Sequence, residues 1–140
     1  MIGPFTPTAP PTSYVTFLEC ARCGARADHT KEAHLCTGCG GPLLVRYDLE
    51  RIKASVPRNV LYGRRASLWR YRELLPLDDA ENAVSLGEGN TPLYELPVLG
   101  AKLGLHRLAV KDEGLLPTGT FKARGAAVGV SRAGELGATA

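Results

Sequence analysis

The chain has 140 residues, of which 44% are hydrophobic and 22% charged, and this ordinary globular composition excludes wholesale disorder. Aromatic residues make up only 6%, so any core must consist mainly of Ala, Leu and Val, which bury less area than aromatic rings. The net charge of +3 is too small to indicate an acidic partner by itself.

The first segment, residues 1–13, contains four prolines and has neither a basic stretch nor an apolar run. We therefore expect a flexible extended tail there, and neither a signal peptide nor a membrane span. A protein without an export signal is expected in the cytoplasm, where disulfides are rare and paired cysteines more often bind a metal ion.

The second segment, residues 14–47, contains two Cys-x-x-Cys pairs. Its β-branched and aromatic residues predict strands over 14–20 and 43–47, which indicate a small antiparallel, zinc-ribbon-like unit. Two residues between paired cysteines let both sulfurs face one ion, and a glycine after each pair permits the turn. Four thiolates suit a closed tetrahedral Zn²⁺ site with a structural role. The predicted zinc ligands are Cys20, Cys23, Cys36 and Cys39.

Free dithiols and a redox-active pair are two other interpretations of the cysteines, but a thioredoxin-like motif would need only one pair. His29 and His34 lie between the pairs, where either could replace a thiolate. Because four cysteines already complete a tetrahedral site, we expect both histidines at the surface.

Residues 48–84 are predicted to form a helical connecting segment. Asp48 is expected to cap a helix over 49–54, because a side-chain oxygen at that position can accept a free backbone N–H group. Ser67 is expected to cap a second helix, which ends at Pro76.

Seven basic residues and no acidic residue occur between Arg51 and Arg72. This pattern is typical of a solvated helical face, or of a seam against the rest of a larger protein. A phosphate-binding patch is the alternative interpretation.

Residues 85–140 are predicted to begin an α/β catalytic domain, opened by a tight Gly- and Pro-containing loop over 85–93. A parallel strand in such a unit needs a partner delivered by a crossover, and no such strand follows. The domain is therefore expected to be incomplete, with an uncovered apolar face on its last helix. The elements expected are a helix over 96–103 capped by Gly104, a strand over 107–111, and a helix over 121–136 closed by Gly137.

The last of these helices begins beside a lysine. Thr118 or Thr120 is expected to cap the helix, which places Lys122 in its first turn. The helix dipole there favours the neutral amine, and a neutral amine can attack a carbonyl group. A lysine at such a position is usually only solvated, so the surrounding sequence has to decide its role.

Two strings around this lysine occur in a characteristic order: Gly-Glu-Gly-Asn-Thr-Pro-Leu over 87–93, then Lys-Asp-Glu-Gly and Pro-Thr-Gly-Thr-Phe-Lys within 111–122. Both strings resemble threonine synthases and their fold-type II pyridoxal-phosphate relatives, some of which also carry an N-terminal zinc knuckle. The resemblance is good over 85–140. It departs at Thr120, where Ser is frequent, and at Ala123, where threonine synthases usually have Asp.

The resemblance implies that Lys122 is the catalytic residue, which binds pyridoxal 5′-phosphate as a Schiff base and then transfers protons. The substrate would be a phosphorylated amino acid, O-phosphohomoserine, converted with water to threonine and phosphate. The complete protein would be a cytoplasmic, homodimeric lyase of threonine biosynthesis without membrane or nucleic-acid partners. Groups that grip the cofactor's phosphate and pyridine nitrogen are not found in this chain, which alone should be inactive. Thr91 and Thr120 either face the substrate or serve as turn and cap residues.

Two alternatives stay open at this point. The same scaffold also serves threonine or serine dehydratases and synthases of cysteine or cysteate, which these 140 residues cannot separate from a threonine synthase. The second alternative is a zinc-ribbon module that binds nucleic acid or protein through 51–72, although that stretch offers few aromatic rings for stacking.

Overall fold

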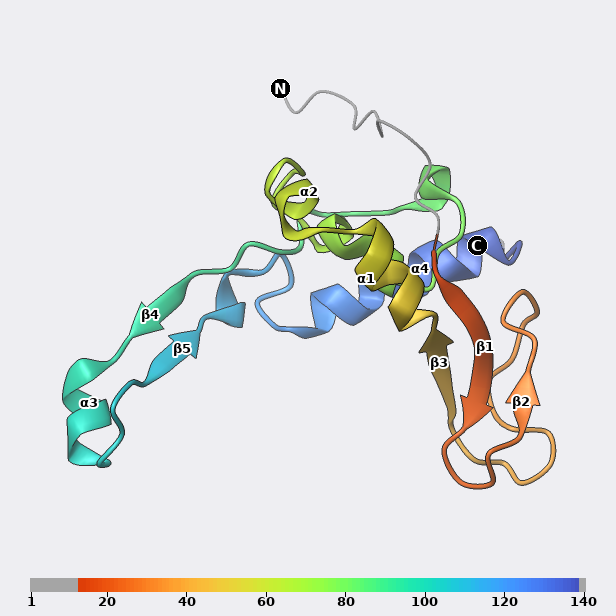
Figure 1. Ribbon diagram of the computed structural model, residues 1–140, viewed down its shortest axis with the longest axis horizontal. Helices are drawn as coiled ribbons and strands as arrows, with labels where there is room; N and C mark the ends of the chain where they lie inside the picture. Colours follow the sequence, from red (N-terminus) through yellow and green to blue (C-terminus); the bar gives the residue numbers. More distant parts are fainter. Residues whose placement is uncertain (1–12, 139–140) are drawn as a thin grey trace.

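The structure is a computed structural model that describes residues 13–138, so all of the predicted 1–13 tail except Ser13 lies outside it. Within this range the chain is mixed α/β, as predicted. Figure 1 shows an elongated arrangement with a small sheet at one end, short helices in the middle and a two-stranded arm at the other end. No helix in the described range is long and apolar enough to cross a membrane.

The small sheet contains the two predicted strands, β1 (Val15–Cys20) and β3 (Leu43–Tyr47), which run antiparallel. A third strand, β2 (Arg26–Ala27), pairs with the other edge of β1 and was not predicted. Two residues are too few to show an alternating pattern in the sequence. The sheet therefore confirms the predicted antiparallel unit and extends it by one short strand.

The helix after the sheet, α1 (Leu49–Ser55), begins as predicted. The Asp48 carboxylate accepts the Arg51 N–H at 2.9 Å, which satisfies one of the free donors of the first turn. The next helix, α2 (Arg58–Tyr62), was not predicted. It is five residues long and buries no side chain, so its sequence contains no amphipathic signal.

The predicted cap at Ser67 is wrong. The helix that follows, η1 (Leu68–Leu74), is a 3₁₀ helix, and the Ser67 side chain makes no capping hydrogen bond. Instead, the Leu68 N–H donates to the Glu88 carbonyl oxygen at 2.7 Å. A distant loop therefore satisfies the donor that a local cap would otherwise take.

The basic stretch forms part of an internal contact. Arg64 donates two hydrogen bonds, of 2.7 and 2.6 Å, to the carboxylate of the buried Glu73. Burial opposes ionisation of Glu73, but the Arg64 hydrogen bonds and charge outweigh it and lower the pKa of this carboxyl. The Arg51 guanidinium lies over the Tyr14 ring at 4.7 Å. Part of the basic stretch is therefore paired within this chain, whereas a seam against the rest of a larger protein stays a prediction.

The arm consists of β4 (Leu93–Glu95), α3 (Pro97–Lys102) and β5 (Ala109–Lys111). The predicted α3 and β5 are present, and Gly104 has the positive φ of 68° that ends such a helix. We expected β5 to lack a partner within this chain and to need a parallel one, but it pairs antiparallel with β4. This correction arises because all three residues of β4 are exposed and the strand is too short to show an alternating pattern.

The last helix, α4 (Lys122–Glu135), follows the short 3₁₀ turn η3 (Glu113–Leu115). Its face was expected to be uncovered, but the 3₁₀ turn η2 (Ala80–Asn82) contacts part of it. The Ser131 hydroxyl, which is fully buried, accepts the Val84 N–H at 2.8 Å. Val130, the residue before it, is 58% exposed, so the helix is covered on one face only. The side chains of this thin core are Trp69, Leu77, Ala80, Leu116, Ala123 and Ala127.

Candidate functional site

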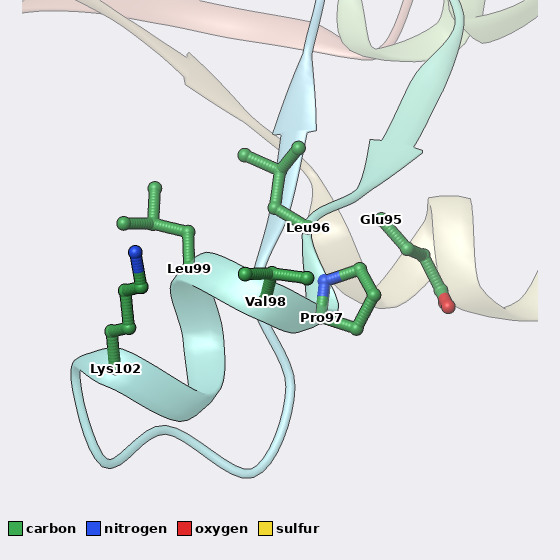
Figure 2. Close-up of a pocket in the computed structure, with 6 residues that line it drawn as sticks. All are labelled: Glu95, Leu96, Pro97, Val98, Leu99 and Lys102. Carbon is green, nitrogen blue, oxygen red and sulfur yellow. The ribbon is translucent and has the colours of Figure 1, made fainter.

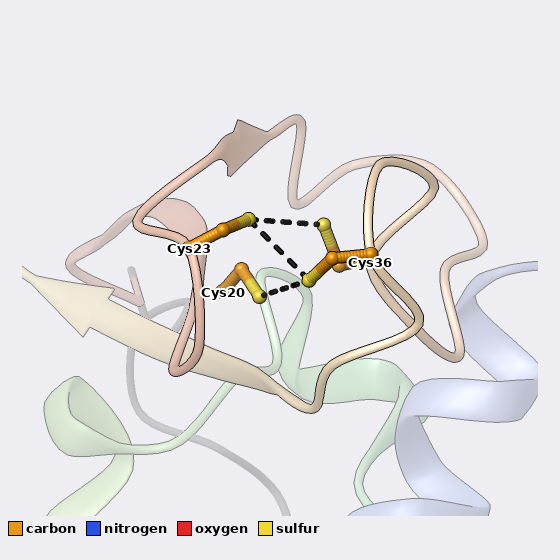
Figure 3. Close-up of side chains that lie close together, drawn as sticks. Cys20, Cys23 and Cys36 are labelled. Atoms are coloured by element: carbon orange, nitrogen blue, oxygen red, sulfur yellow. Dashed lines mark hydrogen bonds between the residues drawn. The ribbon is translucent and has the colours of Figure 1, made fainter.

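The four cysteine sulfurs meet in one cluster, formed by the turn that follows β1 and the turn that precedes β3 (Figure 3). The sulfur of Cys39 lies 3.5 Å from those of Cys20 and Cys23, and Cys23 lies 3.7 Å from Cys36. A tetrahedral zinc ion with Zn–S bonds of about 2.3 Å separates its sulfurs by roughly 3.8 Å. The cluster therefore has nearly the dimensions of a four-thiolate zinc site.

Backbone turns hold each cysteine pair. Gly24 (φ 73°) and Gly40 (φ 66°) have positive φ, and their N–H groups donate to the carbonyls of Cys20 and Cys36. The N–H groups of Cys23 and Arg22 lower the pKa of Cys20 to about 6. Thiolates packed so closely would repel one another unless a cation neutralised them, which is the condition that a metal ion meets.

Neither histidine joins the cysteine cluster. His34 is at the surface and contacts Glu32 at 2.9 Å, as expected. The His29 ring is more covered than expected, at 20% exposed, and its Nδ1 lies 3.8 Å from the Asp78 carboxylate. Among the described residues, the cluster of potential metal ligands consists of cysteines alone.

The loop between the cysteine pairs contacts the C-terminal end of α4. The Arg132 guanidinium donates to the His29 carbonyl and to the Asp78 carboxylate, the latter at 3.2 Å. Glu135 accepts the N–H groups of Asp78 and Asp79 at 2.9 and 2.6 Å. The cysteine unit is thereby joined to the helix whose opposite end carries Lys122.

The Lys122 side chain is exposed at the start of α4, and its amine lies 4.5 Å from the centre of the Phe121 ring. It forms no ion pair with the carboxylates that the structure describes. The Thr120 hydroxyl accepts the Lys122 N–H at 3.3 Å, but Phe121 occupies the cap position, so the predicted cap at Thr118 or Thr120 is wrong. The amine is thus accessible to solvent.

A polar network lies under this turn of α4. Arg124 donates to the two carboxylate oxygens of Glu113 at 2.6 and 2.8 Å, and to the Thr91 hydroxyl at 3.1 Å. The same hydroxyl donates to Glu113 at 2.6 Å, and the Lys111 amine donates to the Thr91 carbonyl at 3.0 Å. The hydrogen bonds from Arg124 and Thr91 lower the pKa of Glu113 to about 2. Thr91 is thus held within the protein by its hydroxyl and its carbonyl oxygen, and whether it faces a substrate stays a prediction.

A second buried carboxylate shapes the loop before β4. Glu88 is 2% exposed and accepts the Ser85 hydroxyl at 2.7 Å and the Leu86 N–H at 3.0 Å. Burial opposes its ionisation, but these hydrogen bonds outweigh the effect and lower the pKa of Glu88. The loop is therefore organised around its own acidic residue.

Three residues of these networks were missed from the sequence. Glu88 and Glu113 lie inside the two characteristic strings and Arg124 lies two residues after the second one, but no role was assigned to them. All three are charged residues in a Gly-rich loop or at the start of a helix. Such a segment is partly buried in a folded domain, and a partly buried charge needs a partner, so this pattern could have indicated the ion pairs.

The pH dependence of stability tests the Glu113 contact. Its folded pKa of about 2 is below the ordinary value of 4.5, so the unfolded chain binds more protons between these values. Wild-type stability should therefore fall as the pH decreases through this range, and Glu113→Gln should show a smaller decrease. Urea unfolding at a series of pH values measures the difference, and parallel curves would contradict the assigned contact.

A cavity of about 330 Å³ lies on α3, away from these networks (Figure 2). Its walls are mostly apolar and contain none of the predicted site residues. The residues that line it are Glu95, Leu96, Pro97, Val98, Leu99 and Lys102.

Comparison with known proteins shows which family and which enzymes the sequence resembles. Residues 84–140 match the pyridoxal-phosphate dependent enzyme family. The chain is 48% identical to a threonine synthase of Methanocaldococcus jannaschii over 84% of its length, and 42% identical to one of Methanosarcina acetivorans over 86%. The predicted family resemblance is confirmed. A threonine synthase of Synechocystis is 44% identical over 54% of the chain and 21% of its own length.

The resemblance to threonine synthases concerns a part of those enzymes. The chain spans 29% of the length of the two archaeal relatives. No solved structure matches the chain. The match to the pyridoxal-phosphate dependent family includes both the Glu88 loop and the helix that carries Lys122.

Proposed function

We propose that this chain supplies the cofactor-binding lysine, Lys122, of a fold-type II pyridoxal-phosphate enzyme with threonine synthase activity. The observation that carries the proposal is the 48% identity to a threonine synthase over most of the chain, with an exposed, unpaired lysine amine inside the matched family segment. Because the chain spans 29% of that relative, the activity would belong to the complete protein, cytoplasmic in our proposal.

The residues present fit a cofactor that attaches through an amine. Pyridoxal phosphate, when bound, supplies an electron sink for negative charge that develops on an amino-acid substrate. Lys122 would hold the cofactor and move a proton at its Nζ atom. Thr120 fixes the backbone of the first turn through the Lys122 N–H. No residue of this chain is assigned to the cofactor's phosphate.

For the substrate we propose O-phosphohomoserine, which loses phosphate and gains water. The similar proteins are threonine synthases, which supports this choice over a dehydratase or a cysteine or cysteate synthase. At position 123, where threonine synthases usually have Asp, the alanine side chain is 2% exposed and packs into the core.

For the cysteine cluster we propose a structural Zn²⁺ bound by Cys20, Cys23, Cys36 and Cys39. The sulfur separations and the positive-φ glycines after each pair support it. Four protein ligands leave no open position on a tetrahedral ion, so the role is structural. A nucleic-acid module is not favoured, because Arg64 in the basic stretch is already paired with Glu73.

The test uses the complete protein that contains this chain. Pyridoxal phosphate is added, and the visible absorbance of the lysine-bound cofactor is recorded for the wild type, Lys122→Ala and Lys102→Ala, an exposed lysine on α3. We expect the absorbance band to disappear only in Lys122→Ala. Phosphate release from O-phosphohomoserine, with serine and threonine as competing substrates, then tests the reaction. A band that survives in Lys122→Ala would refute the assigned lysine.

A further inference from the structure

The first turn of α4 is weakly held by its own backbone. Phe121 occupies the cap position in a helical conformation and provides no side-chain hydrogen bond. The N–H groups of Lys122 and Ala123 each make a long bond of 3.3 Å to Thr120, and that of Arg124 makes one of 3.2 Å to Phe121. A helix end with weak capping bonds frays, so another contact must fix this turn.

The Arg124 side chain provides that contact. Its guanidinium forms a two-point pair with Glu113, which follows β5, and a third bond to Thr91, which precedes β4. Arg and carboxylate groups match in this planar geometry, which fixes direction as well as distance. The turn is therefore anchored to the two segments that join the arm to the rest of the chain.

The anchor and the lysine lie on different sides of the helix. Residues two positions apart are separated by roughly 200° around an α-helix. Arg124 is directed inward to Glu113, whereas Lys122 is exposed. Holding Arg124 thus restricts the direction in which Lys122 leaves the helix.

We propose that Arg124 and Glu113 are positioning residues that fix the direction and environment of the Lys122 amine. The role of that amine rests on the proposed function, but the positioning itself can be measured without catalysis. Glu113→Gln and Arg124→Lys keep size or charge while they remove the two-point pair. Glu95→Gln is the control, because it breaks an exposed ion pair with Arg107 within the same arm.

The experiment measures amide hydrogen exchange along α4 in the chain. Exchange at residues 122–124 should rise about tenfold or more in both test variants, with little change at residues 130–135 and none in the control. The labelling of Lys122 relative to Lys102, by pyridoxal phosphate and borohydride reduction followed by peptide mapping, should change in the same variants. Glu113→Asp, which retains the charge, should restore part of the protection.

Two outcomes would overturn the proposal. Exchange that is unchanged at residues 122–124 would show that the pair does not hold the first turn. Exchange that rises equally along the helix, with unchanged relative labelling of Lys122, would indicate a purely structural pair. A local effect in these variants, combined with an absorbance band that survives in Lys122→Ala, would support the positioning and reject the proposed function.

Discussion

Gly89→Ala is expected to destabilise the chain by roughly 3 kcal/mol or more. Gly89 has a φ of 123°, and a Cβ atom there would lie 2.7 Å from the backbone nitrogen of Leu68 and from the carbonyl carbon of Ser67. These are backbone atoms, so no side-chain rotation can relieve the clash. The same close approach brings the Leu68 N–H to the Glu88 carbonyl, so this hydrogen bond should be lost too.

Gly87→Ala is the matched control for this prediction. Gly87 also has a positive φ, of 95°, but an added Cβ meets no atom within 4 Å. It should cost only the conformational strain, of order 1 kcal/mol. The free energy of unfolding of both variants can be measured by urea unfolding. The probe is the fluorescence of Trp69, the single tryptophan, which is buried beside this contact. Equal losses in the two variants would show that the close approach of the loop to Leu68 is not formed.

The second large effect is expected at the cysteine cluster, where Gly41→Ala should weaken zinc binding by about tenfold or more. An added Cβ would lie 2.8 Å from the Cys20 sulfur and 3.2 Å from the Cys39 sulfur. Forcing an extra methyl group into such a site costs roughly 1–3 kcal/mol, and each 1.4 kcal/mol changes an affinity about tenfold. Competition with a chromophoric chelator measures the zinc affinity.

Gly38→Ala provides the control at this cluster. Its Cβ would meet only the Cys36 sulfur, at 3.9 Å, which is an ordinary contact. Its zinc affinity should therefore stay close to that of the wild type. If both variants bind zinc as the wild type does, the packing of Gly41 against the sulfurs is wrong, and if the wild type binds none, the zinc proposal is wrong.

Local signals in the sequence predicted the elements that form through local interactions. The strand over 43–47 matches β3, and Asp48 caps α1 as expected, because its carboxylate acts on a residue three positions away. The helix that carries Lys122 was also predicted, since its Ala-rich sequence and closing Gly137 are local features. The Cys-x-x-Cys spacing likewise predicted that the four sulfurs meet, and they do so in the structure.

Long-range contacts decide what could not be predicted. Ser67 fails as a cap because Glu88, about twenty residues later, takes the donor of the next residue. β4 exists only through its pairing with β5, and the two are separated by α3. Arg124 and Glu113 meet across the loop between β5 and α4, so neither residue alone indicates the pair. Side-chain partners of this kind depend on the folded arrangement and leave no periodic pattern in the sequence.

The order in which these contacts can form during synthesis follows from the position of the small sheet. All of its pairings, and all four cysteines, lie within residues 15–47, whereas the partners of α4 are spread from His29 to Glu113. Hairpins form in roughly microseconds, while a ribosome adds about 5–20 residues each second. The cysteine unit therefore has seconds to fold before Arg132 emerges. The His29 carbonyl is then already in place as a docking point when the lysine-bearing helix arrives.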